Sequence, residues 1–502
     1  MDRFSDGFLF GASSSAFQIE GSLDRDGRGP SVWDAFIARP GRERLRSDAA
    51  TACDHYARWA DDVAIAGELG LDAYRFSVSW PRIQPDGRGE PNRAGLDFYS
   101  RLVDGLLERD VRPFPTLFHW DLPLALQRDS GGFRDRDTAA RFEDYAGIVA
   151  RALGDRVKDW ITINEPFEYA CFGHLFGTHA PGVKSPLAYL QVVHHQLLAH
   201  GRAVSAIRSE AAGARVGIAL SWTPVHPLRD TEADEKAAAR ANAFMNGVSF
   251  DPILLGRYPA LVTRGLLRPP VRDGDFETIS TPLDFVGLNY YSREKARNAP
   301  LVPFIRADVT GKEPRELPES DDRTAMGWEV YHRGLVEILA ELRGRYGNPP
   351  VIVTEFGSAW SDSVETDAAT GRARVGDTRR VRYLRDALAA MRSAIEAGSD
   401  LRGAFVWSLT DNFEWAEGNA KRFGLVHVDY GTQARTVKDS GRWYAGLIAS
   451  RVLDASSRVL DASSRVLDAS SRVLDASSRV LDASSRVLDA SSRVLDASSR
   501  VL

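Results

Sequence analysis

Two glutamates stand where apolar segments of the chain end. Residues 351–354 read Val-Ile-Val-Thr and lead into Glu355, and residues 160–163 read Trp-Ile-Thr-Ile and lead into Asn164-Glu165. Short β-branched runs bounded by proline or glycine are typical of strands that are covered on both faces of a parallel sheet. Two carboxyl groups roughly 5 to 5.5 Å apart can serve as acid/base and nucleophile of a retaining glycosidase. Glu165 and Glu355 are therefore the candidate catalytic residues.

The segments that could carry these glutamates form a regular series along the chain. Strand character alternates eight times with helical periodicity. The predicted strands lie at residues 8–11, 73–80, 112–119, 160–163, 214–222, 284–291, 351–356 and 403–410, and four of the predicted helices lie at 51–70, 95–109, 141–153 and 187–208. Residues whose side chains could bind a ligand or take part in catalysis stand at or just beyond the strand ends: Gln18, Arg75, His119, Glu165, Trp222, Tyr291, Glu355 and Trp407. Because (β/α)8 barrels build their active sites at that end, we predict an α/β fold, a single (β/α)8 TIM barrel with loop insertions.

The last part of the chain differs from the rest. From Arg451 the heptapeptide Arg-Val-Leu-Asp-Ala-Ser-Ser is repeated seven times without change. Adjacent Val and Leu do not form the seam of a coiled coil, and paired serines weaken a helix. We therefore predict a catalytic domain at residues 1–450 and a disordered or loosely helical tail at 451–502, and we keep open an oligomerising role for the tail.

Composition excludes several classes of function. The formal net charge of -5 over 502 residues implies no polyanionic partner, so nucleic acid is not expected. No window approaches the ~20 apolar residues of a membrane span, and the acidic N-terminal segment lacks the core of a signal peptide, so we expect a cytoplasmic protein. His194, His195 and His200 lack the carboxylate or cysteine that would complete a metal site, and we expect neither metal nor cofactor. Whether the protein is a monomer or a homo-oligomer stays open.

Several motifs resemble those of one known family along residues 1 to about 450. They are Phe10-Gly11-Ala12 through Gln18-Ile19-Glu20-Gly21, Tyr74-Arg75-Phe76-Ser77, His119-Trp120-Asp121-Leu122-Pro123, Thr162-Ile163-Asn164-Glu165-Pro166, Leu288-Asn289-Tyr290-Tyr291, Trp407-Ser408-Leu409-Thr410-Asp411-Asn412-Phe413-Glu414-Trp415 and Lys421-Arg422-Phe423-Gly424-Leu425. Each motif is weakly specific, but their joint occurrence in this order is highly specific. The chain thus resembles glycoside hydrolase family 1, which contains β-glucosidases and β-galactosidases.

The resemblance implies a role for each matching residue. Glu165 is the expected acid/base and Glu355 the expected nucleophile, which attacks the anomeric carbon of a small-molecule β-glycoside. Tyr291 would hydrogen-bond Glu355 with Arg75 beside it, and Asn164 would hold the sugar 2-hydroxyl. The residues expected to bind the other hydroxyls or the sugar ring are Gln18, His119, Trp120, Trp407, Glu414 and Trp415, and those expected to support the site are Asn289 and Phe423.

Substrate class and two departures follow from the same comparison of motifs. Glu414-Trp415 matches the subfamily that acts on unphosphorylated sugars, since a charged carboxylate here would repel a 6-phosphate. Phe356 replaces the asparagine that usually follows the nucleophile, and Phe167 replaces a tryptophan common two places after the acid/base. We expect the first change to alter the support of Glu355 and the second to alter aglycone preference.

These observations together predict a retaining β-glucosidase. The expected substrates are unphosphorylated β-glucosides and cello-oligosaccharides, with β-galactosides and β-fucosides as further candidates. Two alternatives stay open: a transglycosidase, which passes the same glycosyl intermediate to a sugar or alcohol, and a catalytically silent relative that only binds sugar.

Overall fold

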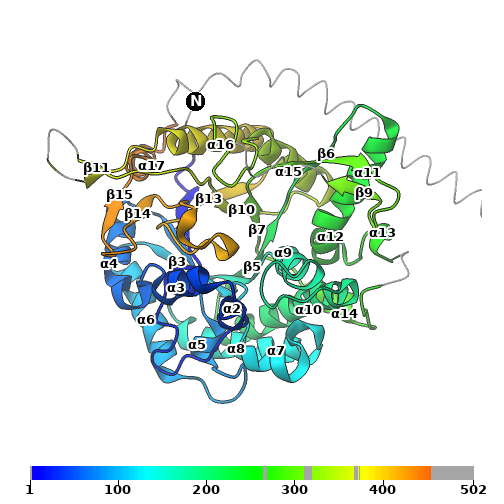
Figure 1. The fold of residues 1–502 in the computed structure, drawn as a ribbon, viewed down its shortest axis with the longest axis horizontal. Helices are drawn as coiled ribbons and strands as arrows, with labels where there is room; N and C mark the ends of the chain where they lie inside the picture. Colours follow the sequence, from blue (N-terminus) through cyan, green and yellow to red (C-terminus); the bar gives the residue numbers. More distant parts are fainter. Residues whose placement is uncertain (1–2, 264–267, 310–318, 367–370, 372, 454–502) are drawn as a thin grey trace, which may run out of the picture. The chain divides into compact units, whose positions relative to one another are not determined.

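Eight parallel strands close into a barrel at the centre of the computed structural model (Figure 1), which describes residues 3–263, 268–309, 319–366, 371 and 373–453. Neighbouring strands follow the order β1-β13-β10-β7-β5-β4-β3-β2. Their bounds are β1 Leu9–Ser13, β2 Ala73–Ser77, β3 Arg112–Phe118, β4 Asp159–Asn164, β5 Arg215–Ser221, β7 Phe285–Tyr290, β10 Val351–Phe356 and β13 Leu401–Trp407. Each predicted strand overlaps one of these, so the predicted barrel is confirmed.

A ring of helices surrounds the strands (Figure 1). The helices that link successive strands include α4 His55–Glu68, α6 Arg93–Leu107, α8 Asp137–Leu153, α10 Pro186–Glu210, α12 Val248–Leu255, α15 Arg333–Arg345 and α16 Thr378–Glu396, and α17 Asp439–Ser450 follows the last strand. Their apolar faces pack inward; in α6, for example, Phe98, Leu102 and Leu106 are fully buried.

Shorter elements decorate the loops between these units. The short helices are α1 Ala16–Ile19, α2 Val32–Ile37, α3 Glu43–Thr51, α5 Trp80–Ile83, α7 Leu124–Ser130, α9 Pro166–Ala170, α11 Glu232–Asn242, α13 Ala260–Thr263 and α14 Asp275–Ile279. The small sheets consist of β6 Val225–Pro227 with β8 Glu294–Asn298 and β9 Ala307–Val309, of β11 Glu365–Thr366 with β12 Ala373–Arg374, and of β14 Val426–Val428 with β15 Arg435–Val437. These are the predicted loop insertions.

Side chains from alternate positions of the strands fill the inside of the barrel. The buried cluster consists of Ala73, Phe114, Ile161, Ala219, Phe285, Ile352 and Phe405. Phe114 contacts Phe405 edge to face at 5.1 Å and Phe285 at 6.2 Å. The barrel is thus a packed core, and the chemistry is confined to its end.

The helix predicted over residues 51–70 is wrong at its start. Helix α3 ends at Thr51 and α4 begins at His55, and between them Ala52 and Asp54 adopt left-handed backbone with φ of 46° and 50°. The break coincides with tertiary contacts of Cys53, whose backbone N–H donates to Ile19 O and whose thiol donates to Asp411 O. Contacts with distant parts of the chain override local periodicity here.

Residues Arg3–Val452 form one compact unit. The predicted repeat tail lies outside the described residues from position 454 onward. Within the described part of the chain, no helix combines the length and the apolar character needed to cross a membrane.

Candidate active site

The two predicted catalytic glutamates come from β10 and from the residue after β4. The register of β10 against β7 shifts between Val353 and Glu355, and the register of β4 against β5 shifts between Ile161 and Asn164. Such irregularities change the direction in which a strand presents its side chains. Both strands therefore depart from regular pairing where they deliver their glutamates.

Glu355 is held by two donors. Arg75 Nη1 donates to Glu355 Oε1 at 2.5 Å, and the Tyr291 hydroxyl donates to Oε2 at 2.7 Å. Arg75 and Glu355 are buried and Tyr291 is half-buried, so the ion pair is shielded from solvent. Burial, and then the charge of Glu355, raises the pKa of Tyr291, which keeps its hydroxyl a donor. These contacts stabilise the negative charge that a nucleophile needs.

Glu165 has a different environment, in which no cation is bonded to its carboxyl group among the described residues. Asn289 Nδ2 donates to Glu165 Oε1 at 2.8 Å. Burial, then the charges of Glu168 and Glu355, raises the pKa of Glu165 well above its ordinary value, against the opposing effects of Asn289 and Arg75. A raised pKa favours the protonated form of Glu165, which is the form that a general acid needs.

Asn164 joins the two glutamates through a shared set of hydrogen bonds. Its Oδ1 accepts from Arg75 Nη2 at 2.6 Å and from Asn289 Nδ2 at 3.0 Å. Its Nδ2 lies 3.1 Å from His119 Nε2. The Trp120 indole N–H donates to the backbone oxygen of Asn164 at 3.0 Å. The first of these contacts ties the arginine that holds Glu355 to the strand that delivers Glu165.

The contacts of Asn164 also define the tautomer of His119. Because Asn164 Oδ1 accepts two hydrogen bonds, its Nδ2 is the donor to His119 Nε2. Burial, and then the charge of Arg75, lowers the pKa of His119 well below its ordinary value, so the imidazole is neutral. Its proton then lies on Nδ1, which has no hydrogen-bond partner in the described structure. This buried N–H is free to donate to a ligand hydroxyl.

Glu414 lies near Gln18 from α1. Gln18 Oε1 accepts from Ser15, and its Nε2 donates to Phe413 O at 2.9 Å and lies 3.4 Å from Glu414 Oε2. Burial, then the charge of Glu355, raises the pKa of Glu414 to about 8, although hydrogen bonds from Trp407 and Gln18 oppose the rise. Near pH 7 the group is mostly protonated, whereas the expected repulsion of a 6-phosphate requires the charged form.

Aromatic rings form a continuous cluster beside these polar groups. Trp415 stacks on Phe17 with ring centroids 6.0 Å apart and contacts Trp120 at 4.9 Å. Trp407 lies 5.7 Å from His119 and packs in a buried cluster with Phe423. The cluster brings together predicted sugar-binding residues from the loop after β3, the end of β13 and the loop after β13.

Three of the predicted site residues have an unusual backbone. Trp120, Glu165 and Trp415 adopt φ of 77°, 46° and 47°. Positive φ is costly for residues with a bulky side chain and persists only where surrounding contacts impose it. Strain of this kind gathers at functional sites, and here it coincides with residues chosen from the sequence alone.

The two departures from the family motifs are both buried. Phe356 is fully buried in β10 and pairs with Tyr290 and Val406, so the support of Glu355 comes from Arg75 and Tyr291. Phe167 packs edge to face against Tyr189 and Phe244, with centroids 6.2 and 5.7 Å apart.

The sequence reasoning missed Glu168. This residue follows Glu165 by three positions on α9, and the Ser221 hydroxyl at the end of β5 donates to its Oε1. Burial raises the pKa of Glu168 to about 7. A second acidic residue one helical turn after a candidate acid was the available signal.

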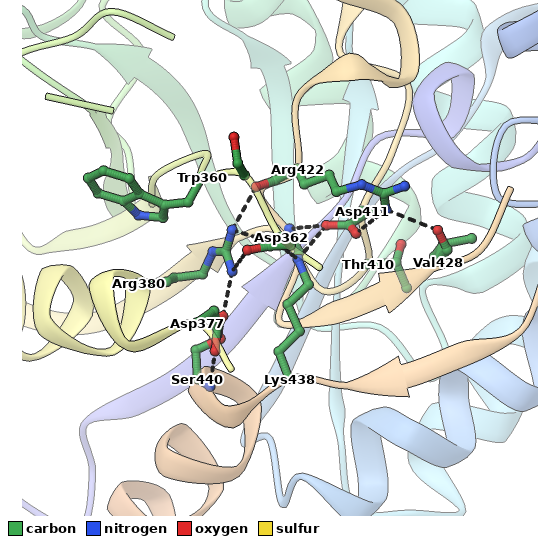
Figure 2. A network of polar contacts seen from close by, with 12 residues as sticks. Trp360, Asp362, Asp377, Arg380, Thr410, Asp411, Arg422, Val428, Lys438 and Ser440 are labelled. Carbon is green, nitrogen blue, oxygen red and sulfur yellow. Dashed lines mark hydrogen bonds and ion pairs between the residues drawn. The ribbon is translucent and has the colours of Figure 1, made fainter. Parts of the chain in front are cut away.

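It also missed a buried network of charges around Lys438, Asp411 and Arg380 (Figure 2). Lys438 Nζ lies 2.6 Å from Asp411 Oδ1 and 2.5 Å from Asp362 Oδ2, and Arg422 Nη1 lies 2.7 Å from Asp411 Oδ2. Arg380 extends the network by pairing with Asp362 at 2.9 Å. The network ties the loop after β13 to the loop after β10.

The histidines considered for a metal site have other partners. His194 Nε2 lies 2.8 Å from Asp275, His195 Nδ1 lies 2.9 Å from Phe133 O, and His200 Nδ1 lies 2.6 Å from Thr162. The described part of the chain contains no group of three or more His, Cys, Asp or Glu side chains placed to hold a metal ion.

Known proteins are similar to this chain in both sequence and fold. The model described as Glycosyl hydrolase family 1 matches residues 1–452. Beta-glucosidase A of Thermotoga maritima is 44% identical over 456 residues, which cover 90% of this chain and 99% of that protein. A bifunctional beta-D-glucosidase/beta-D-fucosidase of Bifidobacterium breve is 43% identical over 462 residues, which cover 89% of this chain and 98% of that protein. The solved structure of the Thermotoga maritima beta-glucosidase in complex with glucoimidazole superposes with a TM-score of 0.83 at 42% identity, covering 90% of this chain and 100% of that one. The chain therefore belongs to glycosyl hydrolase family 1.

Proposed function

We propose that this family 1 enzyme is a retaining β-glucosidase that releases terminal non-reducing β-D-glucosyl residues from unphosphorylated β-glucosides and cello-oligosaccharides. The observation that carries the proposal is the difference between the surroundings of two carboxyl groups at the ends of β10 and β4. Glu355 accepts hydrogen bonds from Arg75 and Tyr291, whereas the carboxyl group of Glu165, among the described residues, is bonded to the amide of Asn289. The two donors stabilise a negative charge on Glu355, and burial raises the pKa of Glu165, which is the division that a double displacement requires.

In the first step, a carboxylate oxygen of Glu355 attacks the anomeric carbon of the bound glucoside. The bond to the leaving-group oxygen breaks, and Glu165 gives its proton to that oxygen, so that the aglycone leaves as a neutral alcohol. The glucosyl group is then joined to Glu355 by an ester bond. Asn164 Nδ2 has a second hydrogen beyond the one directed at His119, and this hydrogen can be donated to the sugar 2-hydroxyl.

In the second step, the ionised Glu165 takes a proton from water while the water oxygen attacks the anomeric carbon. The ester bond to Glu355 breaks, and both glutamates return to their starting states. Two inversions give net retention, so the product is β-glucose. An alcohol or sugar in place of water would give transglycosylation by the same route.

The substrate range rests on Glu414 and on the relatives. A mostly protonated Glu414 can donate one hydrogen bond and accept others, which suits neighbouring hydroxyls such as the 4- and 6-hydroxyls of glucose. The name of the Bifidobacterium breve relative includes both β-D-glucosidase and β-D-fucosidase. We therefore include β-fucosides, which lack the 6-hydroxyl, and β-galactosides, which differ at C4, as further substrates.

Proton NMR of the reaction on phenyl β-D-glucoside tests this function. The proposal expects β-glucose as the first sugar to appear, followed by slow mutarotation to the α anomer. First appearance of α-glucose would contradict retention, and no release of phenol would favour a silent sugar-binding relative. Addition of methanol distinguishes transfer from hydrolysis, because transfer gives methyl β-D-glucoside.

A further inference from the structure

Glu168 is a half-buried acid that the proposed mechanism does not use. It lies on α9, whose N-terminal cap is Glu165. The backbone N–H of Tyr169 donates to Glu165 O at 3.2 Å, so Glu165 and Glu168 belong to the same first turn of the helix. The Ser221 hydroxyl on β5 donates to one carboxyl oxygen of Glu168, and the other, Oε2, is buried without a hydrogen-bond partner in the described structure. Ser221 therefore holds a carboxyl group on the same helical turn as Glu165.

Negative or neutral groups surround Glu168. The titratable groups that interact with it are Glu165, Glu355 on β10 and Tyr189 on α10. In the described structure, no lysine or arginine forms an ion pair with Glu168.

The other elements packed against α9 carry few groups that could change the charge around Glu168. Asp251 on α12 is bonded to Arg345 and Tyr346. On the helical turn Cys171–Leu175 the titratable groups are Cys171 and His174, and the ring of His174 contacts Tyr169. The charge of Glu168 therefore acts mainly on Glu165 and Glu355.

The charge of Glu168 acts on Glu165. Burial raises the pKa of Glu168 to about 7, and the hydrogen bond from Ser221 limits the rise. Burial, and next the negative charge of Glu168, holds the pKa of Glu165 well above its ordinary value. An ionised Glu168 therefore opposes the loss of the proton from Glu165.

We propose that Glu168 is a positioning residue whose carboxylate, fixed by Ser221, keeps the proton on Glu165 and so extends the activity of the enzyme to higher pH. Glu168 acts through Glu165 and does not touch the reacting atoms. The inference rests on the proposed function, because it requires Glu165 to be the proton donor.

The test is the pH dependence of kcat/KM for phenyl β-D-glucoside, whose poor leaving group needs the proton from Glu165. In Glu168→Gln and in Glu168→Met, two neutral variants of similar length, we expect the alkaline limb to move to lower pH by about one unit, a roughly tenfold loss at any pH on that limb. Glu168→Asp retains the charge and should keep the limb near its wild-type position. Glu143→Gln, which removes an exposed acid, is the matched control and should leave the profile unchanged.

A second substrate separates this effect from a structural defect. The leaving group of 2,4-dinitrophenyl β-D-glucoside departs without protonation, so its kcat/KM should follow the same alkaline profile in wild type and in both neutral variants. An unshifted limb in the neutral variants with phenyl β-D-glucoside would overturn the inference, as would an equal shift in Glu168→Asp. A wild type that cleaves neither substrate would instead refute the proposed function.

Discussion

The guanidinium of Arg75 is bonded to both halves of the site, because it reaches Glu355 Oε1 at 2.5 Å with Nη1 and Asn164 Oδ1 at 2.6 Å with Nη2. Its Nε donates to Thr116 at 3.0 Å, so the side chain is held from β3 as well. Arginine can make such a fork because its donors lie in one plane. Arg75 therefore orients the predicted nucleophile relative to the strand that carries Glu165.

Replacement of Arg75 by lysine should impair catalysis although it keeps the positive charge. A single ammonium group cannot reproduce the fork to Glu355 and Asn164. Loss of one hydrogen bond to a charged group costs about 1.5–3 kcal/mol, so we expect kcat/KM for an aryl β-D-glucoside to fall roughly 10- to 150-fold. Arg88→Lys alters an exposed ion pair with Asp129 and serves as the control. Wild-type kinetics in Arg75→Lys would refute this role.

Glu165→Gln should lower kcat/KM more for substrates with a poor leaving group than for substrates with a good one. Because the pKa of Glu165 is raised, the wild-type residue keeps its proton to higher pH than an ordinary glutamate and loses it as the pH rises through the raised value. The glutamine cannot donate this proton, and general acid catalysis contributes about 10²- to 10⁴-fold. We expect kcat/KM for phenyl β-D-glucoside to fall by this factor and that for 2,4-dinitrophenyl β-D-glucoside to change little. Equal losses on both substrates would argue against the assigned role.

Discrimination against a 6-phosphate should depend on pH. The pKa of Glu414 is raised to about 8, so its charge, and with it the repulsion of a phosphate, grows as the pH rises through 8. The ratio of kcat/KM for an aryl β-D-glucoside to that for its 6-phosphate should therefore increase between pH 7 and pH 9. In Glu414→Gln this increase should disappear. A ratio that stays constant with pH in the wild type would show that the charge of Glu414 does not set the preference.

Asp411→Asn should destabilise the fold through the buried network (Figure 2). Removal of one partner of a buried ion pair leaves an uncompensated charge and costs about 3–5 kcal/mol in the free energy of unfolding, measured by denaturant titration. Lys438 and Arg422 would each lose their bonds to this carboxylate. Asp400→Asn removes an exposed pair with Arg402 and should cost less than about 1 kcal/mol.

The same network predicts how the difference in the free energy of unfolding between Asp411→Asn and wild type varies with pH. Burial raises the pKa of Asp411, but the charges of Lys438 and Arg422 outweigh burial and hold it below the ordinary value. A lowered pKa means that the stabilisation is present above the pKa of the unfolded chain, about 3.9, and is lost as the pH falls through the folded value. The two proteins should therefore converge in stability in acid, and a constant difference down to pH 2 would contradict this assignment.

The sequence could predict the barrel because its signals are local. Each strand is a short apolar run that ends at a polar or aromatic residue, as in residues 351–356, and parallel strands bring such ends to one face. The helix boundary near Cys53 could not be found in this way, since its contacts with Ile19 and Asp411 come from distant parts of the chain.

The candidate site, too, could be predicted from the sequence only in part. The family motifs identified the residues that gather around Glu165 and Glu355, but not the raised pKa values of Glu168 and Glu414. Those values depend on burial and on the three-dimensional neighbours of the two groups. The network around Lys438 was equally hidden, because its partners Asp362 and Asp411 are separated from it by 76 and 27 residues.

The most direct test of the central claim is azide rescue of Glu355→Gly on 2,4-dinitrophenyl β-D-glucoside. If Glu355 is the nucleophile, the variant should be almost inactive alone, and azide should occupy the space of the lost carboxylate and attack from the same face, giving α-glucosyl azide. The same experiment on Glu165→Gly should give β-glucosyl azide, because azide then replaces the incoming water. A β-glucosyl azide from Glu355→Gly, or activity equal to wild type without azide, would contradict the assignment of the two glutamates.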